Sequence, residues 1–295
     1  MSEPNSRRSF LFGRSARAQD AWSSFVVRLR HACAGPVRLV STRQAHLKPA
    51  RLDDVLRARE FCQTFGVLLA LDGLPLPQVD QDKPVLWVEA GSNWGSLMPL
   101  GDTGLWRVDA GCPCAGLEAA GLLEPALAGA PLNLAQWFAR AARHERLADA
   151  ACMAALVRVD WLLPDGTLEV FGPFGQRDDQ PLRSLAAQTL VPQLFQLTTQ
   201  LSAWPVWSRP HWPMRFHLDA LADPEQVNLA HLFIGHGGSL GWLVAATFQK
   251  PAAPMPARAP VCWPAFDPQV EDFDQRVKQA LDPKGIFLSL ADQTG

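Results

Sequence analysis

Apolar positions at helical spacing predict several amphipathic helices along the chain. Residues 21–33 carry apolar side chains three or four positions apart with arginines and a histidine between them. Residues 52–62 repeat this pattern before Gly66, and residues 188–201 and 273–281 show it again in the second half of the chain. The first helix is expected to pack on the body of the protein or on a partner.

Short apolar runs of strand length predict a sheet beside these helices. The runs are rich in Val, Leu, Ile, Phe and Trp, which suit a pleated surface, and they cover residues 67–71, 85–88, 105–108, 216–218 and 232–234. Two further runs, 157–163 and 167–172, are joined by Pro-Asp-Gly and predict a β-hairpin. The order of helix, strand and strand over residues 52–88 predicts a small α/β unit.

Composition and charge narrow the functions that the chain can have. With 295 residues, of which 48% are hydrophobic and 19% charged, the chain can bury a large core in one or two domains. A formal net charge of −2 gives no general attraction to phosphate backbones, so we expect no nucleic-acid partner. The chain contains no uncharged apolar run of about 18 residues or more, so we expect no membrane span.

The first residues resemble an export signal in part. Residues 6–11 read Ser-Arg-Arg-Ser-Phe-Leu and look like a twin-arginine motif. Such a signal needs an apolar core of about 7 to 15 residues after the basic part. Residues 13–20 are instead polar and charged, so we expect a cytoplasmic protein.

Residue types that carry chemistry are sparse. There is no tyrosine, and the six cysteines lack the spacing of a zinc site or an iron–sulfur cluster. Cys112 and Cys114 form the one close pair and are expected to be reduced thiols. A metal site at His231, His236 and Asp219 is an alternative, but the spacing matches no known motif and we predict none.

Three segments together resemble one family. Asp109-Ala110-Gly111, leading to Gly121-Leu122, looks like a strand, tight turn and short helix, and the Pro-Asp-Gly hairpin follows in the expected order. Near the end, residues 281–287 read Leu-Asp-Pro-Lys-Gly-Ile-Phe. In this order the segments resemble FAD-linked oxidases with a p-cresol methylhydroxylase-type flavin domain, and within them the small FAD-binding subunit of glycolate oxidase.

The resemblance implies a fold, a domain layout and a cofactor. It implies an α+β fold with a two-part FAD-binding domain over residues 47–180, preceded by an arm and amphipathic helix over 1–46 and followed by a reduced cap and C-terminal helix over 181–295. It implies that FAD is held at the segments matching the family's cofactor contacts, namely Asp72, Gly73, Leu74, Ala110, Gly111, Cys112, Gly121, Asn133, Ala135 and Gln136.

Two of these segments depart from the family pattern. The loop after residue 71 keeps Gly73 but contains Pro75 and Pro77, which have no N–H to give to a diphosphate. Ala135-Gln136 stands where the family has a glycine pair. Gly235 to Leu243 tempts a phosphate-loop interpretation but lacks the lysine, and looks more like a Gly-Gly-x-x-x-Trp-Leu stretch of the glycolate oxidase subunit.

Two functions of different classes therefore stay open. In the first, the chain is the FAD-binding subunit of a glycolate- or lactate-oxidase-like complex that passes electrons from a 2-hydroxy acid to another oxidoreductase subunit. In the second, it keeps the fold without FAD and is a structural or regulatory subunit of such a complex. No residue presents itself as a catalytic base, because Tyr is absent and His217 and His236 are no more than candidates.

Overall fold

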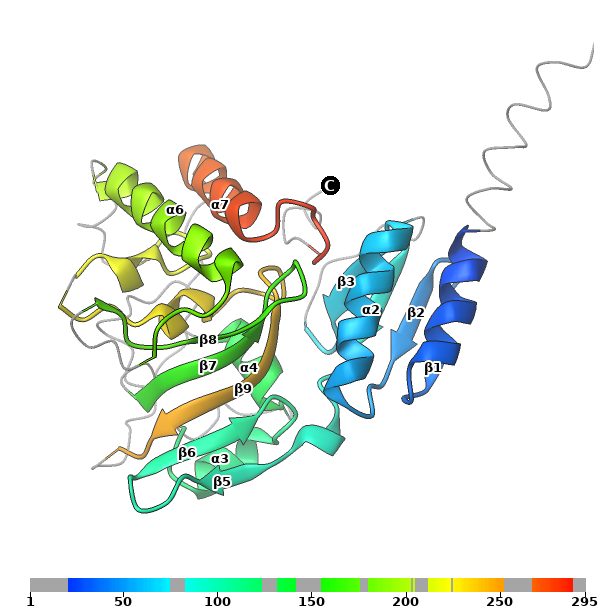
Figure 1. Ribbon diagram of the computed structural model, residues 1–295, viewed down its shortest axis with the longest axis horizontal. Helices are drawn as coiled ribbons and strands as arrows, with labels where there is room; N and C mark the ends of the chain where they lie inside the picture. Colours follow the sequence, from blue (N-terminus) through cyan, green and yellow to red (C-terminus); the bar gives the residue numbers. More distant parts are fainter. Residues whose placement is uncertain are drawn as a thin grey trace, which may run out of the picture.

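The protein is described here by a computed structural model. It describes residues 21–74, 83–123, 132–141, 155–175, 180–202, 204, 212–223, 225–251 and 267–288. The fold is α+β, as predicted, and contains two sheets side by side (Figure 1). The twin-arginine-like stretch, Pro75, Pro77, Cys152, Cys262 and His211 lie outside the described residues.

The first sheet combines parallel and antiparallel pairing. It contains β1 (Val37–Leu39), β2 (Gln44–Leu47), β3 (Leu68–Leu71) and β4 (Val85–Val88) in the order β1-β2-β4-β3. β4 is parallel to both neighbours, whereas β1 and β2 form an antiparallel hairpin. The crossover between β2 and β3 is α2 (Leu52–Phe65), which ends at Gly66 in the left-handed conformation with φ 65°.

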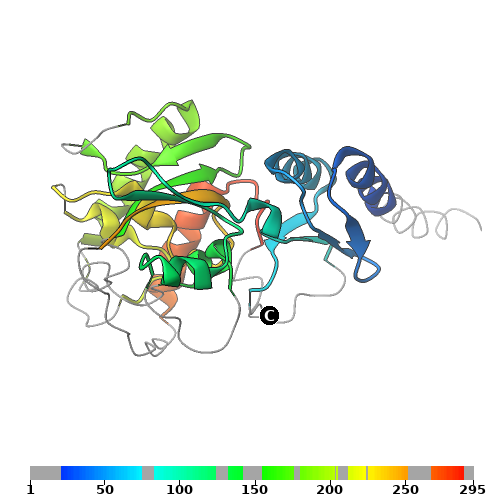
Figure 2. The same cartoon turned by 90° about the horizontal axis from the view of Figure 1, so that it is seen from below.

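Two helices cover one face of this sheet. Figure 2 shows a helix over residues 21–32 and α2 on the same side of the strands. Phe25 and Leu29 of the first helix and Val55 of α2 are fully buried in one core with Ala45 and Leu47 of β2. The helix predicted over 21–33 therefore packs on the body of the protein, and the alternation of apolar residues in β2 places its buried side under the helices.

The second sheet is antiparallel throughout. Its strands are β5 (Leu97–Pro99), β6 (Leu105–Asp109), β7 (Leu156–Leu162), β8 (Leu168–Phe171) and β9 (Trp242–Gln249), in the order β5-β6-β9-β7-β8. β7 and β8 are the predicted hairpin. The middle strand β9 pairs with β6 on one side and β7 on the other, although it follows both of them far along the chain. It therefore joins β5 and β6 to the β7–β8 hairpin in one sheet.

Short and long helices surround the second sheet. They are η1 (Ser92–Trp94), α3 (Cys114–Ala119), α4 (Leu134–Arg140), α6 (Leu185–Ser202), η5 (Leu218–Leu221), η6 (Leu229–Phe233) and α7 (Pro268–Leu281). The predicted helices at 188–201 and 273–281 are confirmed as α6 and α7, which pack on each other. The strands predicted at 216–218 and 232–234 are wrong: Leu218 begins the 3-10 helix η5, Leu232 and Phe233 end the 3-10 helix η6, and all three side chains are buried in the core.

The C-terminal tail joins the two sheets. The Leu69 N–H donates to the Ile286 carbonyl at 2.8 Å, and the Leu288 N–H donates to the Leu69 carbonyl at 2.9 Å, so the tail runs beside β3 as a short parallel bridge. Strand pairing also crosses both predicted domain boundaries: β1 and most of β2 lie before residue 47, and β9 lies after residue 180. No comparison tests those boundaries, which stay a prediction.

The helices are too short or too polar for a bilayer. Within the described ranges, no helix is both long and apolar enough to span a membrane.

Candidate functional site

Nine of the ten predicted cofactor residues meet at one place. The turn 72–74 follows β3, the turn 110–112 follows β6, and residues 133–136 begin α4. The Ala135 N–H donates to the Ala110 carbonyl at 2.8 Å, and the Gln136 side chain donates to the Asp72 carbonyl at 3.1 Å. We call this meeting point, where the Gln136 side chain fills the space beside Gly73, the cleft. It lies between the turn that follows β3 of the first sheet and the turn that follows β6 of the second.

Gly121, the tenth predicted residue, has a different role. It ends α3 with φ 72°, and its N–H donates to the Glu118 carbonyl at 2.9 Å. A Cβ added here would meet only the Lys250 side chain, at 3.8 Å. Gly121 is thus explained by the left-handed helix end, where glycine is the favoured residue.

The start of α4 is closed by a capping box. The Gln136 N–H donates to the Asn133 Oδ1 at 2.9 Å, and the Asn133 N–H donates to the Gln136 Oε1 at 3.2 Å. The Asn133 Nδ2 donates to the Ala90 carbonyl at 3.0 Å. The first N–H groups of a helix bind an anion only when they are free, and here they are used within the protein.

Gly73 makes room for Gln136. Its φ is 77°, and a Cβ built on it would lie 2.0 Å from the Gln136 Nε2. A glycine that lets a phosphate approach leaves open space beside its Cα, whereas the space beside Gly73 holds a protein amide. The neighbouring Asp72 carboxylate contacts the His46 Nε2 at 2.8 Å, and the Asp72 N–H donates to the Val88 carbonyl at 2.9 Å.

Gly111 is needed for close packing of backbone on backbone. A Cβ built on Gly111 would lie 2.0 Å from the Gly91 carbonyl oxygen and 3.0 Å from that of Trp94. Its N–H donates to the Trp94 carbonyl at 3.0 Å, and the Cys112 N–H donates to the Asp109 carbonyl at 3.0 Å. The Ala110 N–H donates to the Val244 carbonyl at 3.0 Å, so the turn after β6 gives its donors to the segment before β5, to β9 and to itself.

The cysteines near the cleft are buried thiols. Burial raises the pKa of the Cys112 thiol and raises that of Cys114 to about 12. Both side chains are buried, and so are Cys33 and Cys62. A thiolate is the reactive and metal-binding form, so a raised pKa lowers the reactivity of Cys112 and Cys114 at neutral pH.

Large aromatic side chains fill the space beneath α4. Phe138 is fully buried, with its ring centroid 6.2 Å from those of Trp161 and His236. Trp161 also stacks on Phe233 with centroids 4.4 Å apart. In the resembling family, small residues of this helix lie against the flavin, whereas here the helix carries Trp137 and Phe138.

The glycine-rich loop before β9 supports the other end of α4. The Gly235 and Gly237 N–H groups each donate at 2.9 Å, to the Phe138 and Ala139 carbonyls. The Gly238 N–H donates to the His236 Nδ1 at 3.1 Å, and a Cβ on Gly238 would lie 3.0 Å from the Leu74 side chain. The loop thus closes the last turn of α4 and packs on the turn 72–74.

The candidate histidines are dispersed. His217 pairs with Asp219 at 3.1 Å between Nδ1 and Oδ1, and the His231 Nε2 lies 3.3 Å from the Leu156 carbonyl oxygen. In the part of the chain that the structure describes, no three His, Cys, Asp or Glu side chains come together as metal ligands.

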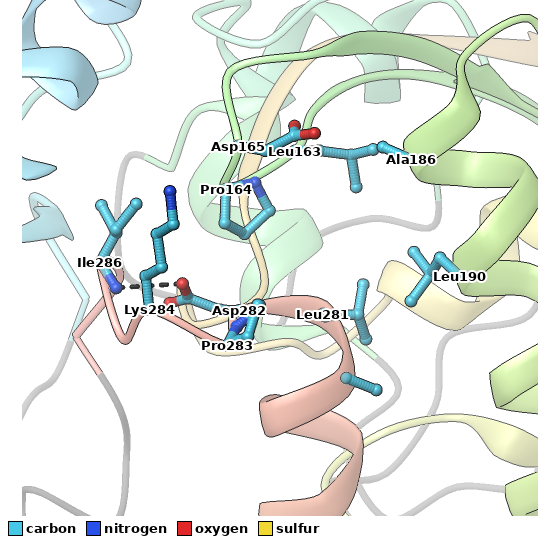
Figure 3. Close-up of a pocket in the computed structure, with 11 residues that line it drawn as sticks. Leu163, Pro164, Asp165, Ala186, Leu190, Leu281, Asp282, Pro283, Lys284 and Ile286 are labelled. Carbon is cyan, nitrogen blue, oxygen red and sulfur yellow. Dashed lines mark hydrogen bonds between the residues drawn. The ribbon is translucent and has the colours of Figure 1, made fainter.

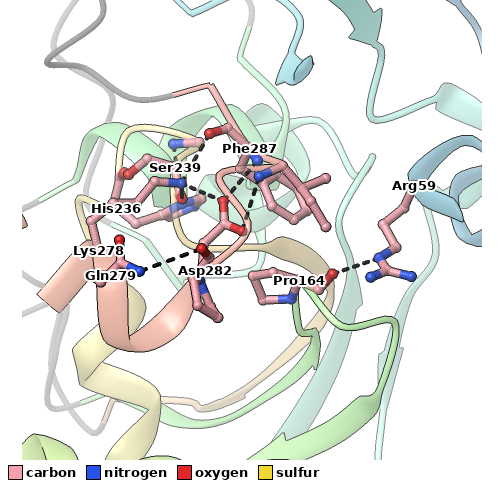
Figure 4. Close-up of polar contacts among 11 residues, drawn as sticks. Arg59, Pro164, His236, Ser239, Lys278, Gln279, Asp282 and Phe287 are labelled. Carbon is pink, nitrogen blue, oxygen red and sulfur yellow. Dashed lines mark hydrogen bonds and ion pairs between the residues drawn. The ribbon is translucent and has the colours of Figure 1, made fainter. Parts of the chain in front are cut away.

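The C-terminal turn depends on contacts that the sequence analysis missed. The Asp282 carboxylate accepts from the Ile286 and Phe287 N–H groups at 3.0 and 2.9 Å and from the Lys278 ammonium at 2.6 Å (Figure 4). Lys278 also donates to the Ser239 carbonyl at 2.6 Å. The spacing of four residues between Lys278 and Asp282 was the available signal, because such positions face each other on a helix.

Arg59 of α2 forms a second contact between the part of the protein around the first sheet and the part around the second sheet. Its Nε donates to the Pro164 carbonyl at 2.6 Å, in the hairpin turn between β7 and β8 (Figure 4). Burial lowers the pKa of its guanidinium, and Asp165 and Asp282 oppose that effect. An arginine inside the predicted apolar face of α2 was the signal for this contact.

A cavity of about 150 Å³ lies away from the cleft. Its mostly apolar lining comes from the β7–β8 turn, α6 and the end of α7, as Figure 3 shows for Leu163, Leu190 and Leu281. None of the ten predicted residues lines it. The buried carboxylate on its wall, Asp282, is already fully engaged in the turn described above.

Comparison with solved structures gives distant matches. No protein-family model matches the chain, and no curated protein does. Alkyldihydroxyacetonephosphate synthase, in two crystal forms, matches 70% of this chain at 11% and 12% identity with TM-scores of 0.42 and 0.41. A variant of Physcomitrella patens BBE-like 1 matches 76% of it at 11% identity with a TM-score of 0.46. This chain spans 31%, 32% and 44% of those chains, and similarity this low carries no information about its chemistry.

Proposed function

We propose that this chain is a non-catalytic relative of the FAD-binding subunits of glycolate- and lactate-oxidase-like complexes, acting as a structural or regulatory subunit beside another oxidoreductase subunit. The observation that carries the proposal is the position of Gln136. Its side chain bonds the Asp72 carbonyl and fills the space beside Gly73, which is where the family holds the diphosphate of FAD.

The donors in the cleft support the same conclusion. A dinucleotide diphosphate needs several free N–H groups or cations, because two negative charges must leave water. Among the described cleft residues, the N–H groups of Asp72, Gly111, Leu134, Ala135 and Gln136 all donate to protein acceptors. The Asp72 carboxylate adds repulsion. The residues of this cleft therefore do not fit FAD held in the family's manner.

The competing function is the FAD-binding subunit itself. Its support is that segments far apart in the sequence, predicted from the family pattern, meet at one point between two sheets. FAD, if bound there, would supply the redox chemistry on a 2-hydroxy acid. For that, Gln136 would have to leave Gly73, and the capping box of α4 would have to open.

The visible spectrum of the purified protein separates these two functions. We expect no flavin bands after incubation with FAD and gel filtration, and no flavin released on denaturation. About one equivalent of FAD per chain would overturn the proposal. A tagged chain purified from its own cells is expected to bring an oxidoreductase subunit with it, and its isolation as a lone monomer would contradict the subunit role.

A further inference from the structure

The two edge strands of the first sheet, β3 and β1, differ in whether another segment pairs with them. The β3 edge is covered, because the tail at 286–288 pairs with Leu69 through two backbone hydrogen bonds. The opposite edge is β1. Within the described ranges, no segment pairs with the outer side of β1.

The register of β1 shows which backbone groups this edge presents. The Val40 N–H donates to the Gln44 carbonyl at 2.8 Å, and the Pro36 carbonyl accepts from the Lys48 N–H at 3.1 Å, so the even-numbered positions face β2. In an antiparallel ladder the alternate residues face the other way. The N–H and C=O groups of Val37 and Leu39 therefore point outward, ready to form a ladder with another strand.

The side chains around this edge are apolar as well as basic. Leu39 is 53% exposed and Val40 is 63% exposed. Natural proteins blunt an open edge with charges, prolines or bulges, and an apolar open edge is a template for another strand. Arg38 is the single charge on β1, and no ion pair engages it among the described residues.

The charges on the segment that forms this edge are all basic, and the Asp54 carboxylate, which contacts this segment, is buried against the Ala34 and Gly35 N–H groups. Residues 21–43 contain four arginines and one histidine and no Asp or Glu. Arg30, His31 and Arg38 are exposed. The elements that carry them, the helix over 21–32 and the β1–β2 hairpin, lie together at one end of the molecule (Figure 1).

This charge selects among possible occupants. A second copy paired antiparallel about Arg38 would set Arg38 opposite Arg38, and like charges directly opposite destabilise a pair of strands. The first 20 residues of the chain carry four arginines against Glu3 and Asp20, so their net charge has the same sign as the edge. An acidic strand from a different protein carries the opposite charge to this edge, so neither repulsion arises.

We infer that the outer edge of β1 is a docking site for an extended acidic segment of a partner protein, which adds to the sheet as a further strand. Backbone bonds to Val37 and Leu39 supply the ladder, and a carboxylate beside Arg38 supplies selectivity. Alternation of apolar and acidic residues in the segment places apolar side chains beside Leu39 and carboxylates on the face of Arg38.

The test uses two synthetic peptides on the intact chain. One alternates Val and Glu over eight residues, and the other alternates Val and Lys. We expect the Val/Glu peptide to bind at least tenfold more tightly, and to slow hydrogen exchange at the Val37 and Leu39 amides. Equal affinity of the two peptides, protection elsewhere than β1, or no binding at millimolar peptide would overturn the inference.

Two variants sharpen the test, and a third is the control. Arg38→Glu changes an exposed side chain and is expected to reverse the preference, so that the Val/Lys peptide binds better. Leu39→Pro removes one outward N–H and is expected to abolish binding while circular dichroism stays unchanged. Leu168→Ala, on the edge strand β8 and 48% exposed, is expected to bind as the wild type does. A dimer that dissociates on Leu39→Pro would show that a second copy is the occupant, and would overturn the acidic partner.

Discussion

The C-terminal turn and the cleft both lie in segments whose sequence resembles FAD-linked oxidases, but they differ in what their side chains contact. In the turn, the Asp282 carboxylate accepts from the Ile286 and Phe287 N–H groups and from the Lys278 ammonium, so it holds the backbone of the turn itself. In the cleft, the Gln136 side chain bonds the Asp72 carbonyl and fills the space beside Gly73. The difference teaches that both segments use their polar groups within the protein, which is the basis of the proposed non-catalytic role.

The largest expected effect is at the C-terminal turn. Asp282→Ala removes an acceptor of two backbone N–H groups and leaves the Lys278 ammonium, 14% exposed, without its carboxylate. Breaking a buried pair in this way costs about 3–5 kcal/mol. Urea denaturation measures the loss.

Lys284→Ala, exposed in the same turn, is the matched control and is expected to change the free energy of unfolding by less than about 0.5 kcal/mol. Similar values for the two variants would contradict the structural role of Asp282.

The next effect tests packing at the cleft. Gly111→Ala places a Cβ 2.0 Å from the Gly91 carbonyl oxygen, and overpacking of this kind costs about 1–3 kcal/mol. Gly116→Ala in α3 is the control, because its Cβ would meet nothing closer than 3.9 Å and alanine favours a helix. Thermal denaturation should show Gly111→Ala less stable and Gly116→Ala unchanged or more stable. A neutral Gly111→Ala would mean that the space is open for a ligand.

Gln136→Glu isolates the contact that closes the cleft. Glutamate can still complete the capping box, but as a carboxylate it cannot donate to the Asp72 carbonyl and it lies near the Asp72 side chain. We expect a loss of about 1 kcal/mol at pH 7. Protonation restores a donor, so the difference from wild type should shrink below about pH 4. A loss that is equal at both pH values would place the effect in the helix cap alone.

The smallest effect compares two buried carboxylates of one helix region. The Asp282 carboxylate forms an ion pair with the Lys278 ammonium at 2.6 Å. The Asp274 carboxylate accepts from the Arg215 backbone N–H at 3.1 Å, lies 4.0 Å from the Arg215 guanidinium and has Glu271 nearby. Burial raises the pKa of Asp274 to about 7 from 3.8. The folded state therefore binds the extra proton, and its stability falls as pH rises from about 4 through 7.

The measurement is the free energy of unfolding as a function of pH. Between pH 8 and pH 6 we expect the wild type to gain about 1 kcal/mol relative to Asp274→Asn, whose amide does not titrate. A constant difference between the two proteins would show that Asp274 keeps its charge throughout this range.

Local patterns predicted the elements that have a clear period. The helices at 52–62, 188–201 and 273–281 and the hairpin after residue 156 follow from spacing and turn residues, and the structure contains all of them. The runs at 216–218 and 232–234 were mistaken for strands, because a short apolar run buried on all sides looks the same in a strand and in a 3-10 turn. The strand at 44–47 was missed, since Gln44 and His46 interrupt its apolar residues.

The role of the candidate residues in binding a cofactor stays a prediction, and the contact between Gln136 and Asp72 was not predicted. The family pattern placed nine residues that do meet, yet no local signal shows that Gln136 reaches Asp72 across 64 positions. The bridge between Leu69 and Phe287 is equally distant in sequence. Contacts of this kind depend on how the two sheets are placed relative to each other. Periodicity and motif spacing do not predict that arrangement.

A crystal structure of the protein grown with excess FAD tests the central claim most directly. The account predicts that the Gln136 side chain stays bonded to the Asp72 carbonyl and that no flavin density lies between Gly73 and Gly111. A diphosphate in that space, with Gln136 turned away and the α4 N–H groups on the phosphate, would contradict the account and establish a flavoprotein.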